Sequence, residues 1–466
     1  MKKRMVMNAF SQCCPTPQSQ GQWKNPQDRS SIGYRDVEFW IDIARTLERG
    51  HFDALFFADV HGVYDIYGGN MDAGIRHAVQ TPGNDPTLLL PLLAHATKNL
   101  GFIATYSTTY FQPFLTAKLF SSLDHFTDGR VGWNIVTSYL SSAQRNGLGA
   151  TLDHDERYAQ ADEYMEVVYK LWEQSWDADA VVREAERDTH TDPSRIHKIN
   201  HKGMYFEVEG PHQCEPSLQR TPLLVQAGQS PRGMRFGARH AEALFVSFQD
   251  PARAKAGVAE MRAAAVAEGR HPEDVKFLQG IAVVVAETEE EARLKHERYV
   301  GYGSAEGAMA LFGGWTGIDF SGFKPEDKLD SFDSQGMQYL ASFFKSVEGG
   351  RQWTFKEACD YMKLASIANV LVGKPDQVAD QLEQWMDEGD IDGFNLLPII
   401  QPESFNEFVD LVVPELQRRG RMRSSYDGST LRENIYGAGN TRLNAKHPGI
   451  KISRDNRAHH LLRKDR

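Results

Sequence analysis

Residues 223–236 are the segment of this sequence best suited to bind an anion. The apolar run Leu223-Leu-Val-Gln is followed by a Gly-Gln-Ser turn and then by Pro231. Ser230 suits the N-cap of a helix and Pro231 its first turn, so unpaired backbone N–H groups and the positive end of the helix dipole would face outward from the strand. This pattern predicts a phosphate site, although a well-capped helix that binds nothing has the same sequence.

Polar residues also follow other apolar runs of strand length. In a parallel barrel the carboxyl ends of the strands meet at one rim, where catalytic residues gather. Candidates at that rim are 8–14, 59–64, Ser107, 137–139 and 227–230. Among them, Asp59 is either a base, a metal ligand or an acceptor for backbone N–H groups, and Cys14 is either a nucleophile or an inert packing residue. Tyr158, near the start of a predicted helix, either reaches a phosphate or packs in the core.

Three histidines lie close together, but their surroundings do not favour a metal site. His197 and His201 are four residues apart, with His190 upstream. Turn signals begin at Asp192 and Asn200, and no Glu-x-x partner completes a ligand set. We therefore expect a solvated loop and no metal, which disfavours a metal-dependent hydrolase.

Segments typical of strands and helices alternate along most of the chain. The unbroken apolar run 54–58 predicts a strand buried on both faces, as in a parallel sheet, and the apolar spacing over 34–49 predicts a helix before it. Further strands are expected at 4–10, 100–105, 130–137, 243–247, 277–286, 367–372, 393–397 and from Leu223. A capping box at Thr288 and Glu291 predicts the start of another helix. Roughly eight strand–helix repeats predict an α/β fold of the TIM (β/α)8 barrel class.

Two long insertions interrupt this alternation, at about 140–222 and 301–350. The second is rich in glycine and aromatic residues, which predicts a flexible lid, because long insertions in compact domains are usually functional. We expect residues 1–420 to form a single barrel domain that carries both insertions. Residues 421–466 are a basic C-terminal extension, either a docking arm for a neighbouring subunit or a disordered end.

The composition excludes several classes of protein. A net charge of −11 and the lack of a long basic stripe in the first 400 residues disfavour a nucleic-acid partner. Four cysteines, two of them adjacent, suit neither a disulfide framework nor a zinc site and favour a reducing, cytoplasmic location. No signal-peptide core follows the basic N-terminus, and no apolar run approaches the ~20 residues of a membrane span.

Several motifs in a fixed order resemble one enzyme family. They are Asn8-Ala-Phe, Thr46-Leu-Glu-Arg-Gly50, Phe57-Ala-Asp59, Ser122-Leu-Asp-His, Gly129-Arg-Val-Gly-Trp-Asn-Ile-Val-Thr-Ser138, His154-Asp-Glu-Arg-Tyr158 and Gln226-Ala-Gly-Gln-Ser-Pro-Arg-Gly233. Together they resemble the bacterial-luciferase-like, FMN-dependent monooxygenases, in the branch of nitrilotriacetate, dibenzothiophene sulfone, dimethyl sulfide and long-chain alkane monooxygenases. The resemblance covers residue 3 to about 440, and segments 210–217 and 392–395 are most similar to the alkane and dimethyl sulfide members.

The resemblance implies a barrel that binds FMN. A separate flavin reductase would supply the reduced cofactor, which would capture O2 as a flavin C4a-peroxide. The implied FMN-binding residues are Asp59 near the isoalloxazine, Thr137 and Ser138 beside the ring and ribityl chain, and Tyr158, Ala227, Gly228, Gln229 and Ser230 around the phosphate.

The implied substrate pocket combines shared and divergent residues. Cys14, Tyr64 and Gln80 match residues that line the pocket of the alkane branch, and we expect Tyr64, Gln80 and Tyr139 to hydrogen-bond the peroxide or the substrate. Where that branch has histidines, this chain has Pro17, Tyr139 and Leu311. These differences change the polarity of the pocket and its proton donors.

We therefore expect a two-component flavin-dependent monooxygenase that oxygenates a small or chain-like organic substrate. Leu311 and the aromatic insertion favour an apolar substrate such as an alkane, with an organosulfur compound, an amine or an amino-carboxylate as the alternatives. A deazaflavin-dependent dehydrogenase on the same fold and a flavin-binding protein without turnover are further alternatives. The expected partners are the substrate, O2 and the flavin reductase, and we also expect a homo-oligomer, either a dimer or a tetramer.

Overall fold

The parallel strands of this protein close into a barrel, because β10 pairs both with β9 and with β11. The computed structural model describes residues 3–148, 153–228, 230–329, 344 and 353–452. In ring order the strands are β1 (Val6–Gln12), β2 (Ala54–Ala58), β3 (Gly101–Ser107), β4 (Val131–Val136), β9 (Leu223–Gln226), β10 (Ala243–Val246), β11 (Lys276–Val285) and β13 (Gly393–Leu397). The predicted TIM-barrel class is therefore confirmed.

Side chains alternate along each strand between the barrel interior and the surrounding helices. In β2, Phe56 belongs to the interior cluster and stacks on Phe10 at a centroid distance of 5.5 Å. Its neighbour Phe57 points the other way and packs against Trp40 of α2 (Val37–Arg49), with a ring centroid distance of 5.1 Å. Full burial of one aromatic side chain contributes about 1.5–3 kcal/mol, so both faces of the strands stabilise the barrel.

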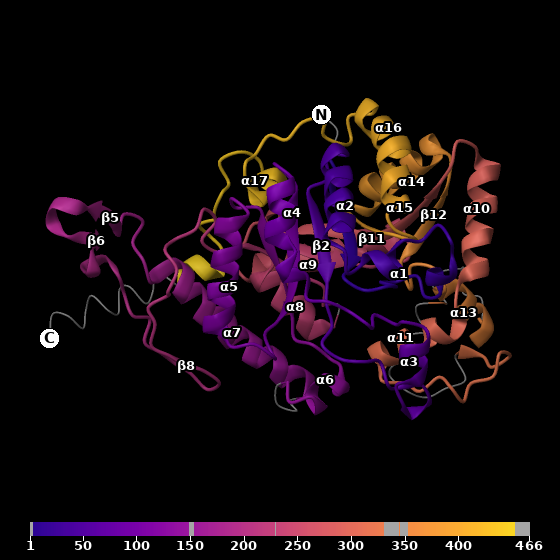
Figure 1. Cartoon of the computed structure of the whole chain (residues 1–466), viewed down its shortest axis with the longest axis horizontal. Helices are drawn as coiled ribbons and strands as arrows, with labels where there is room; N and C mark the ends of the chain where they lie inside the picture. Colours follow the sequence, from indigo (N-terminus) through magenta and orange to yellow (C-terminus); the bar gives the residue numbers. More distant parts are fainter. Residues whose placement is uncertain (1–2, 149–152, 229, 330–343, 345–352, 453–466) are drawn as a thin grey trace.

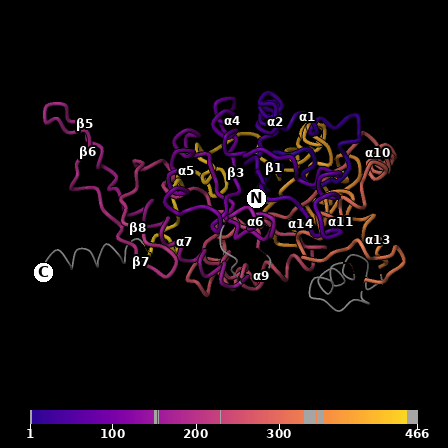
Figure 2. The backbone as a smooth tube through the Cα atoms, turned by 60° about the horizontal axis from the view of Figure 1, so that its bottom comes forward, coloured from indigo at the N-terminus to yellow at the C-terminus, as the bar shows by residue number. Residues whose placement is uncertain are grey.

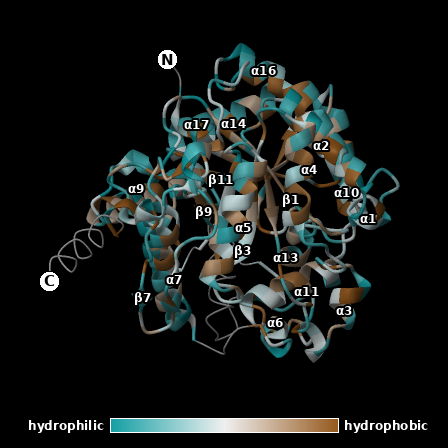
Figure 3. Ribbon diagram, turned by 60° about the vertical axis from the view of Figure 1, so that its left-hand side comes forward, coloured by the Kyte–Doolittle hydropathy of each residue, from teal (hydrophilic) through white to brown (hydrophobic). Residues whose placement is uncertain are grey.

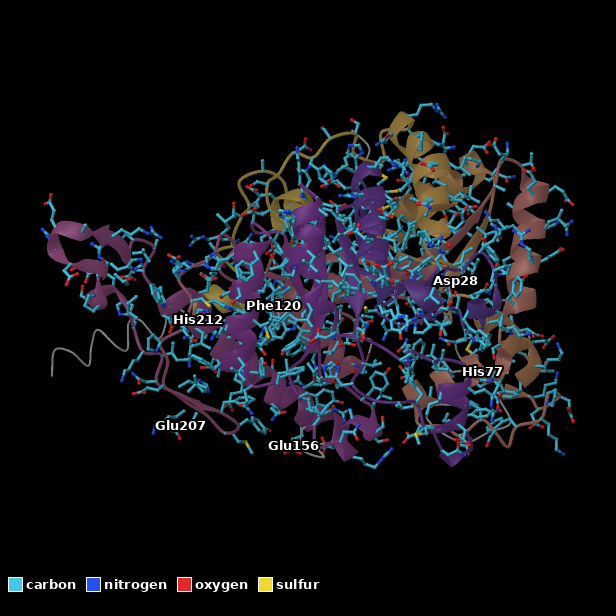
Figure 4. The ribbon with its side chains drawn as sticks, viewed as in Figure 1. Asp28, His77, Phe120, Glu156, Glu207 and His212 are labelled. Atoms are coloured by element: carbon cyan, nitrogen blue, oxygen red, sulfur yellow. The ribbon has the colours of Figure 1, made fainter. Side chains whose placement is uncertain are left out.

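Helices cover the outside of the barrel, and Figure 3 shows apolar strands at the centre with hydrophilic helix surfaces around them. Besides α2, they are α4 (Leu90–Ala96), α5 (Pro113–Phe126), α7 (His154–Gln174), α8 (Pro231–His240), α9 (Pro251–Ala267), α10 (Glu289–Tyr302), α14 (Pro375–Gly389), α15 (Glu403–Glu407) and α16 (Val413–Arg418). Phe120, labelled on α5 in Figure 4, is fully buried. The capping box predicted at Thr288 and Glu291 is present at the start of α10. Among the described residues, none of the helices combines the length and apolar character that a membrane crossing requires.

Two elements differ from the sequence expectation. The strand expected at 367–372 forms as β12 (Asn369–Gly373), but it pairs only with the second half of β11 and lies outside the closed ring. The helix that the sequence pattern predicts over 402–418 is divided into α15, a π-helical turn over Phe408–Val412, and α16. Pro414 follows this turn, and its missing N–H cannot donate an intrahelical hydrogen bond.

The insertion predicted at 140–222 contains two different parts. Its first part forms α6 (Ser141–Arg145) and α7, and α7 packs against α5 and α8 on the barrel. Its second part is an arm of two hairpins, β5 (Val181–Glu184) with β6 (Thr189–Thr191) and β7 (His201–Lys202) with β8 (Glu207–Val208). Figures 1 and 2 both show β5 and β6 extending away from the barrel, and Figure 4 labels Glu207 on the second hairpin.

The glycine- and aromatic-rich insertion contains a packed helix, followed by turns up to Leu329. Residues Ala305–Thr316 are α11, which packs on α3 (Asp72–Arg76) and α13 (Phe355–Met362). His77, labelled in Figure 4 beside α3, links the two segments, since its Nε2 lies 2.6 Å from Glu306 Oε2. The flexible lid expected at 301–350 is therefore a packed helix up to Thr316, and residues 330–343 and 345–350 lie outside the described residues.

The basic C-terminal extension packs on the barrel as far as it is described. This segment contains helix α17 (Leu431–Tyr436). Its Arg432 is buried in a bidentate ion pair, with Nε 2.7 Å from Glu242 Oε1 and Nη2 3.0 Å from Oε2. Arg423 is likewise buried against Asp53. Residues 421–452 therefore belong to the barrel fold, while 453–466 lie outside the described residues.

We predict that Arg432→Ala strongly destabilises the fold, because it leaves the carboxylate of Glu242 buried without its cation. The expected loss is about 3–5 kcal/mol in the free energy of unfolding, measured by urea denaturation. Arg418→Ala is the control, since Arg418 pairs with Glu415 at the surface, where the expected loss is much smaller. Equal losses in the two variants would contradict this placement of the extension.

Candidate active site

A cavity of about 770 Å³ lies at the carboxyl ends of β2, β3, β4 and β9. It gathers most of the residues that the sequence singled out, although they are far apart along the chain. Those that line it are Asp59, Thr137, Ser138, Tyr139, Tyr158, Ala227, Gly228 and Ser230. Gln229 lies outside the described residues. We call this space the main cavity.

One end of the main cavity is formed by the N-terminus of α8. Ser230 caps this helix as predicted, because its Oγ accepts a hydrogen bond from the backbone N–H of Gly233 at 3.0 Å. A Cβ atom added to Gly228 or to Gly233 would lie 2.7 Å from the hydroxyl of Tyr158, so only glycine allows this close approach. The guanidinium of Arg157 also lines the cavity. This end combines hydroxyl donors, a helix N-terminus and one cation, which is the donor set that a phosphate requires.

The rim between β3 and β4 positions Ser138 beside this end. Ser138 donates a hydrogen bond from Oγ to Ser107 Oγ at 2.8 Å. Its φ of 54° lies in the left-handed region, which is uncommon for a residue with a side chain. Such backbone strain persists where the surrounding structure fixes it, and it is frequent at functional sites. Thr109 donates to the carbonyl of Thr137 at 2.7 Å and holds the same loop.

A chain of hydrogen bonds joins Tyr139 to the interior. The carbonyl of Pro17 can only accept, so the Nε2 of Gln80 faces it at 2.9 Å and the Gln80 Oε1 faces Tyr64. The Tyr64 hydroxyl donates to that Oε1 at 2.9 Å, and its oxygen lies 2.7 Å from the hydroxyl of Tyr139. Because the one proton of Tyr64 is used, Tyr139 is the donor to Tyr64. The oxygen of Tyr139 is therefore an acceptor on the side of the main cavity, where the indole N–H of Trp315 is one donor beside it.

Both tyrosines of this chain stay protonated. Tyr139 is 42% exposed as a whole residue, but its hydroxyl is enclosed beside Tyr64 and Trp315, and this desolvation raises its pKa to about 12. Burial raises the pKa of Tyr64 well above its usual range. Tyr64 is only 1% exposed and lies behind the cavity wall, so it touches Tyr139 and Gln80 rather than the cavity space. The backbone of Gln80 has a φ of 51°, a second left-handed residue at this site.

A second cavity of about 350 Å³ adjoins the main one, and Asp59, Val60 and His61 line both. We call it the second cavity. Cys14 and Gln80, which the resemblance implied for the substrate pocket, line this space. Burial raises the pKa of Cys14 well above its usual range, so its thiol is protonated and is not an activated nucleophile.

Asp59 is the ionisable group between the two cavities. Its side chain is 18% exposed, and burial together with the nearby charge of Asp85 raises its pKa to about 7. Its Oδ1 accepts from the backbone N–H of Val60 at 2.9 Å, and its Oδ2 lies 3.4 Å from His61 Nδ1. Burial lowers the pKa of His61, so this imidazole is neutral near pH 7 and does not offset the carboxylate charge.

Helix α11 supplies wall residues that the sequence did not single out individually. Phe312, Trp315 and Thr316 line the main cavity from its last turn. A Cβ on Gly314 would lie 2.1 Å from the ring of Tyr64, so the glycine lets α11 pack directly on the tyrosine. Residues 312, 315 and 316 have the spacing of one face of a helix. This spacing could have predicted the wall, but the glycines of the segment indicated a flexible chain instead. Leu311 is 1% exposed and faces the core, so it does not support an apolar substrate pocket.

Comparison with known proteins places these features in one family. The family model described as luciferase-like monooxygenase matches residues 10–391. A dimethyl-sulfide monooxygenase of Hyphomicrobium sulfonivorans is 43% identical over 97% of this chain and 94% of the relative. A long-chain alkane monooxygenase of Geobacillus thermodenitrificans is 44% identical over 96% of this chain and 97% of the relative.

Solved structures agree with the sequence comparison. The crystal structure of DmoA from Hyphomicrobium sulfonivorans has a TM-score of 0.92 at 43% identity and covers 97% of this chain and 96% of its own. A riboflavin lyase, solved with modified FMN and riboflavin, has a TM-score of 0.89 at 32% identity, covering 97% and 99%. An F420-dependent secondary alcohol dehydrogenase, 14% identical with a TM-score of 0.56, shares the fold alone. The family and branch inferred from the motifs are confirmed.

We predict that Asp59→Asn stabilises the flavin-free protein more at pH 8 than at pH 5. The folded-state pKa of about 7 lies above the ~3.9 of an unfolded chain, so ionisation favours unfolding. Stability is therefore lost as the pH rises from about 4 to 7, and the asparagine escapes this loss. The gain from Asp59→Asn should be about 2–3 kcal/mol larger at pH 8, measured by urea denaturation.

The exposed Asp42→Asn variant on α2 is the control and should change the unfolding free energy by less than about 0.5 kcal/mol at either pH. A gain from Asp59→Asn that is the same at both pH values would show that Asp59 ionises normally.

Proposed function

Because this chain belongs to the luciferase-like monooxygenase family, a family of flavin-dependent enzymes, we propose that it is a two-component monooxygenase that uses reduced FMN and O2. A separate flavin reductase would supply the reduced cofactor. The observation that carries this proposal is the main cavity, where a donor-rich end at α8 and the hydrogen-bonded tyrosine pair line one space. FMN, when bound, supplies the activation of O2 and the transfer of one oxygen atom to the substrate.

The residues present fit FMN. In this proposal Ser230, Tyr158 and the backbone of Ala227 and Gly228 hold the phosphate, where glycines leave room that a Cβ would fill. Thr137 and Ser138 lie beside the ring and ribityl chain, and Asp59 lies near the isoalloxazine. Arg157 adds the positive charge that a phosphate dianion needs in a partly buried site.

Tyr139 has the role of orienting a polar group in the main cavity. Its hydrogen-bond chain ends at the Gln80 amide and the Pro17 carbonyl, and neither titrates near neutral pH. The chain therefore cannot carry a proton away from the cavity. Instead it fixes the hydroxyl of Tyr139 with its lone pair toward a donor, and Gln80 and Tyr64 act as positioning residues.

The wall formed by α11 limits the access of water to this region. Phe312 and Trp315 place aromatic surface along the main cavity, and His77 and Ser304 attach the start of α11 to the loop after α3, with Ser304 Oγ 3.1 Å from His77 Nδ1. Exclusion of water prevents side reactions that would destroy a reactive intermediate before it meets the substrate. The space remaining beside a flavin suits a small or chain-like organic substrate, and we propose that the enzyme acts as a homo-oligomer.

We predict that the double variant Ser230→Ala, Tyr158→Phe weakens FMN binding by about 2–4 kcal/mol, because each lost hydrogen bond to a phosphate contributes ~1.5–3 kcal/mol. Quenching of flavin fluorescence measures the affinity. The control is Ser194→Ala with Tyr205→Phe on the projecting arm, which removes the same two hydroxyls far from the cavity. An unchanged affinity in the cavity variant would contradict the phosphate placement.

The reaction is tested with reduced FMN, an added reductase and a panel of alkane, organosulfur, amine and amino-carboxylate compounds. Oxygenated product is the readout, since NADH consumption also reports uncoupled oxidation. No product from any class, with FMN bound, would favour a flavin-binding protein without turnover.

With the substrate that this panel identifies, we predict that Tyr64→Phe lowers the share of O2 recovered in product at least about tenfold and raises hydrogen peroxide. The phenylalanine leaves the Tyr139 hydroxyl without its acceptor and the Gln80 oxygen without its donor, while FMN affinity should stay within about twofold. Tyr302→Phe on α10, away from both cavities, is the control. Unchanged coupling in Tyr64→Phe would remove the hydrogen-bond chain from the mechanism.

A further inference from the structure

The second cavity is polar and is separated from the main cavity by one short stretch of chain. Asp59, Val60 and His61 border both spaces, so a ligand in the second cavity lies next to the wall of the proposed flavin site. At its other side the cavity reaches the exposed residues Asn84 and Asp85, which connect it to the solvent. A molecule can therefore occupy it and extend toward the main cavity.

The ionisable groups around the second cavity are negative or neutral. Asp59 and Asp85 both line it, and burial together with the charge of Asp85 raises the pKa of Asp59. His61 is neutral because burial lowers its pKa, and the pKa values of the Cys13 and Cys14 thiols are raised, to about 12 for Cys13. In the described part of the chain, no lysine or arginine lines this cavity. A cation placed here would relieve the repulsion between the two carboxylates.

A buried amide at the inner wall also lacks a donor. Gln12, at the end of β1, is 3% exposed and lines the cavity, and its Oε1 has no hydrogen-bond partner among the described residues. An unpaired buried acceptor is unfavourable, and a bound N–H donor would offset this cost. The neighbouring Gln80 cannot compensate, because Pro17 and Tyr64 already use its amide.

We propose that the second cavity binds the protonated amino group of the substrate, so that the enzyme oxygenates an amine with an apolar chain. This inference rests on the proposed monooxygenase function and names its substrate class. Asp59 and Asp85 bind the ammonium, and Gln12 accepts one of its N–H groups. The apolar remainder passes Val60 and His61 toward the aromatic wall of Phe312 and Trp315.

Asp85 provides a variant that changes charge and little else. Its Oδ1 accepts from the backbone N–H of Thr87 at 2.8 Å and from Thr87 Oγ1 at 2.6 Å, so it caps the short helix Pro86–Leu88. Asparagine is an equally good N-cap residue, so Asp85→Asn removes the negative charge and keeps the cap. The matched control is Asp36→Asn, which caps α2 in the same way at an exposed position.

The test titrates the flavin-free protein with octylammonium and with 1-octanol, and calorimetry measures both affinities. We expect octylammonium to bind at least tenfold more tightly than 1-octanol. Asp85→Asn should weaken octylammonium binding about three- to tenfold and leave 1-octanol unchanged, while Asp36→Asn should change neither. Equal affinities for the two compounds, or no effect of Asp85→Asn on the ammonium, would overturn the proposal.

The pH dependence of the same binding gives a second measurement that needs no variant. Octylammonium stays protonated below about pH 10, whereas Asp59 loses its proton around its raised pKa of about 7. The affinity for octylammonium should therefore rise between pH 5.5 and 8, while the affinity for 1-octanol should stay constant. An octylammonium affinity that is flat over this range would exclude Asp59 from the site.

The outcome is separable from that of the proposed function. Amine binding is measured without flavin, and FMN binding is measured without amine. If FMN binds and octylammonium does not, only the substrate class is wrong. If octylammonium binds with the expected charge dependence and FMN does not bind, the second cavity is an amine site and the monooxygenase proposal fails.

Discussion

The pairing of β10 with both β9 and β11 is the constraint on which the site depends, because it closes the sheet into a ring. Closure brings the carboxyl ends of β2, β4 and β9 around one space, although their residues are up to about 170 positions apart in the chain. An open sheet would leave Asp59 and Ser230 on separate strands with solvent between them. The buried ion pairs of Arg423 and Arg432 tie the C-terminal segment to the same barrel.

The sequence predicted the barrel and its rim well because both follow from local patterns. Apolar runs bounded by turns located the strands within about two residues, and the Ser230-Pro231 pair located the cap of α8. Strand ends then predicted which polar residues meet, since parallel strands share one rim. The motifs of the family pointed to the same residues independently. These patterns indicate where each strand and helix begins and ends, and short stretches of sequence determine those positions.

Contacts between distant segments were not predictable in the same way. Tyr64 looked like a residue of the pocket, yet it lies behind the wall, because Gly314 lets α11 pack against its ring. Leu311 suggested an apolar pocket, yet the helical phase of α11 turns it into the core. The glycines of that segment predicted flexibility, whereas in a helix they serve close packing. β12 resembled a ring strand because its composition is the same, and only the register of β11 excludes it.

Charge is distributed unevenly around the rim, so that one side of the site is positive and the other is negative. The helix N-terminus and Arg157 stand at the β9 side, three strands from β2, where Asp59 and Asp85 make the second cavity negative. An anionic phosphate is favoured at the first and repelled at the second, so the charges and the donors at α8 favour the same orientation of the proposed flavin. In the function proposed above, the same distribution of charge would direct a cationic substrate to the second cavity. Burial together with the charge of Asp85 raises the pKa of Asp59, and this is the energetic cost of holding two carboxylates at that side.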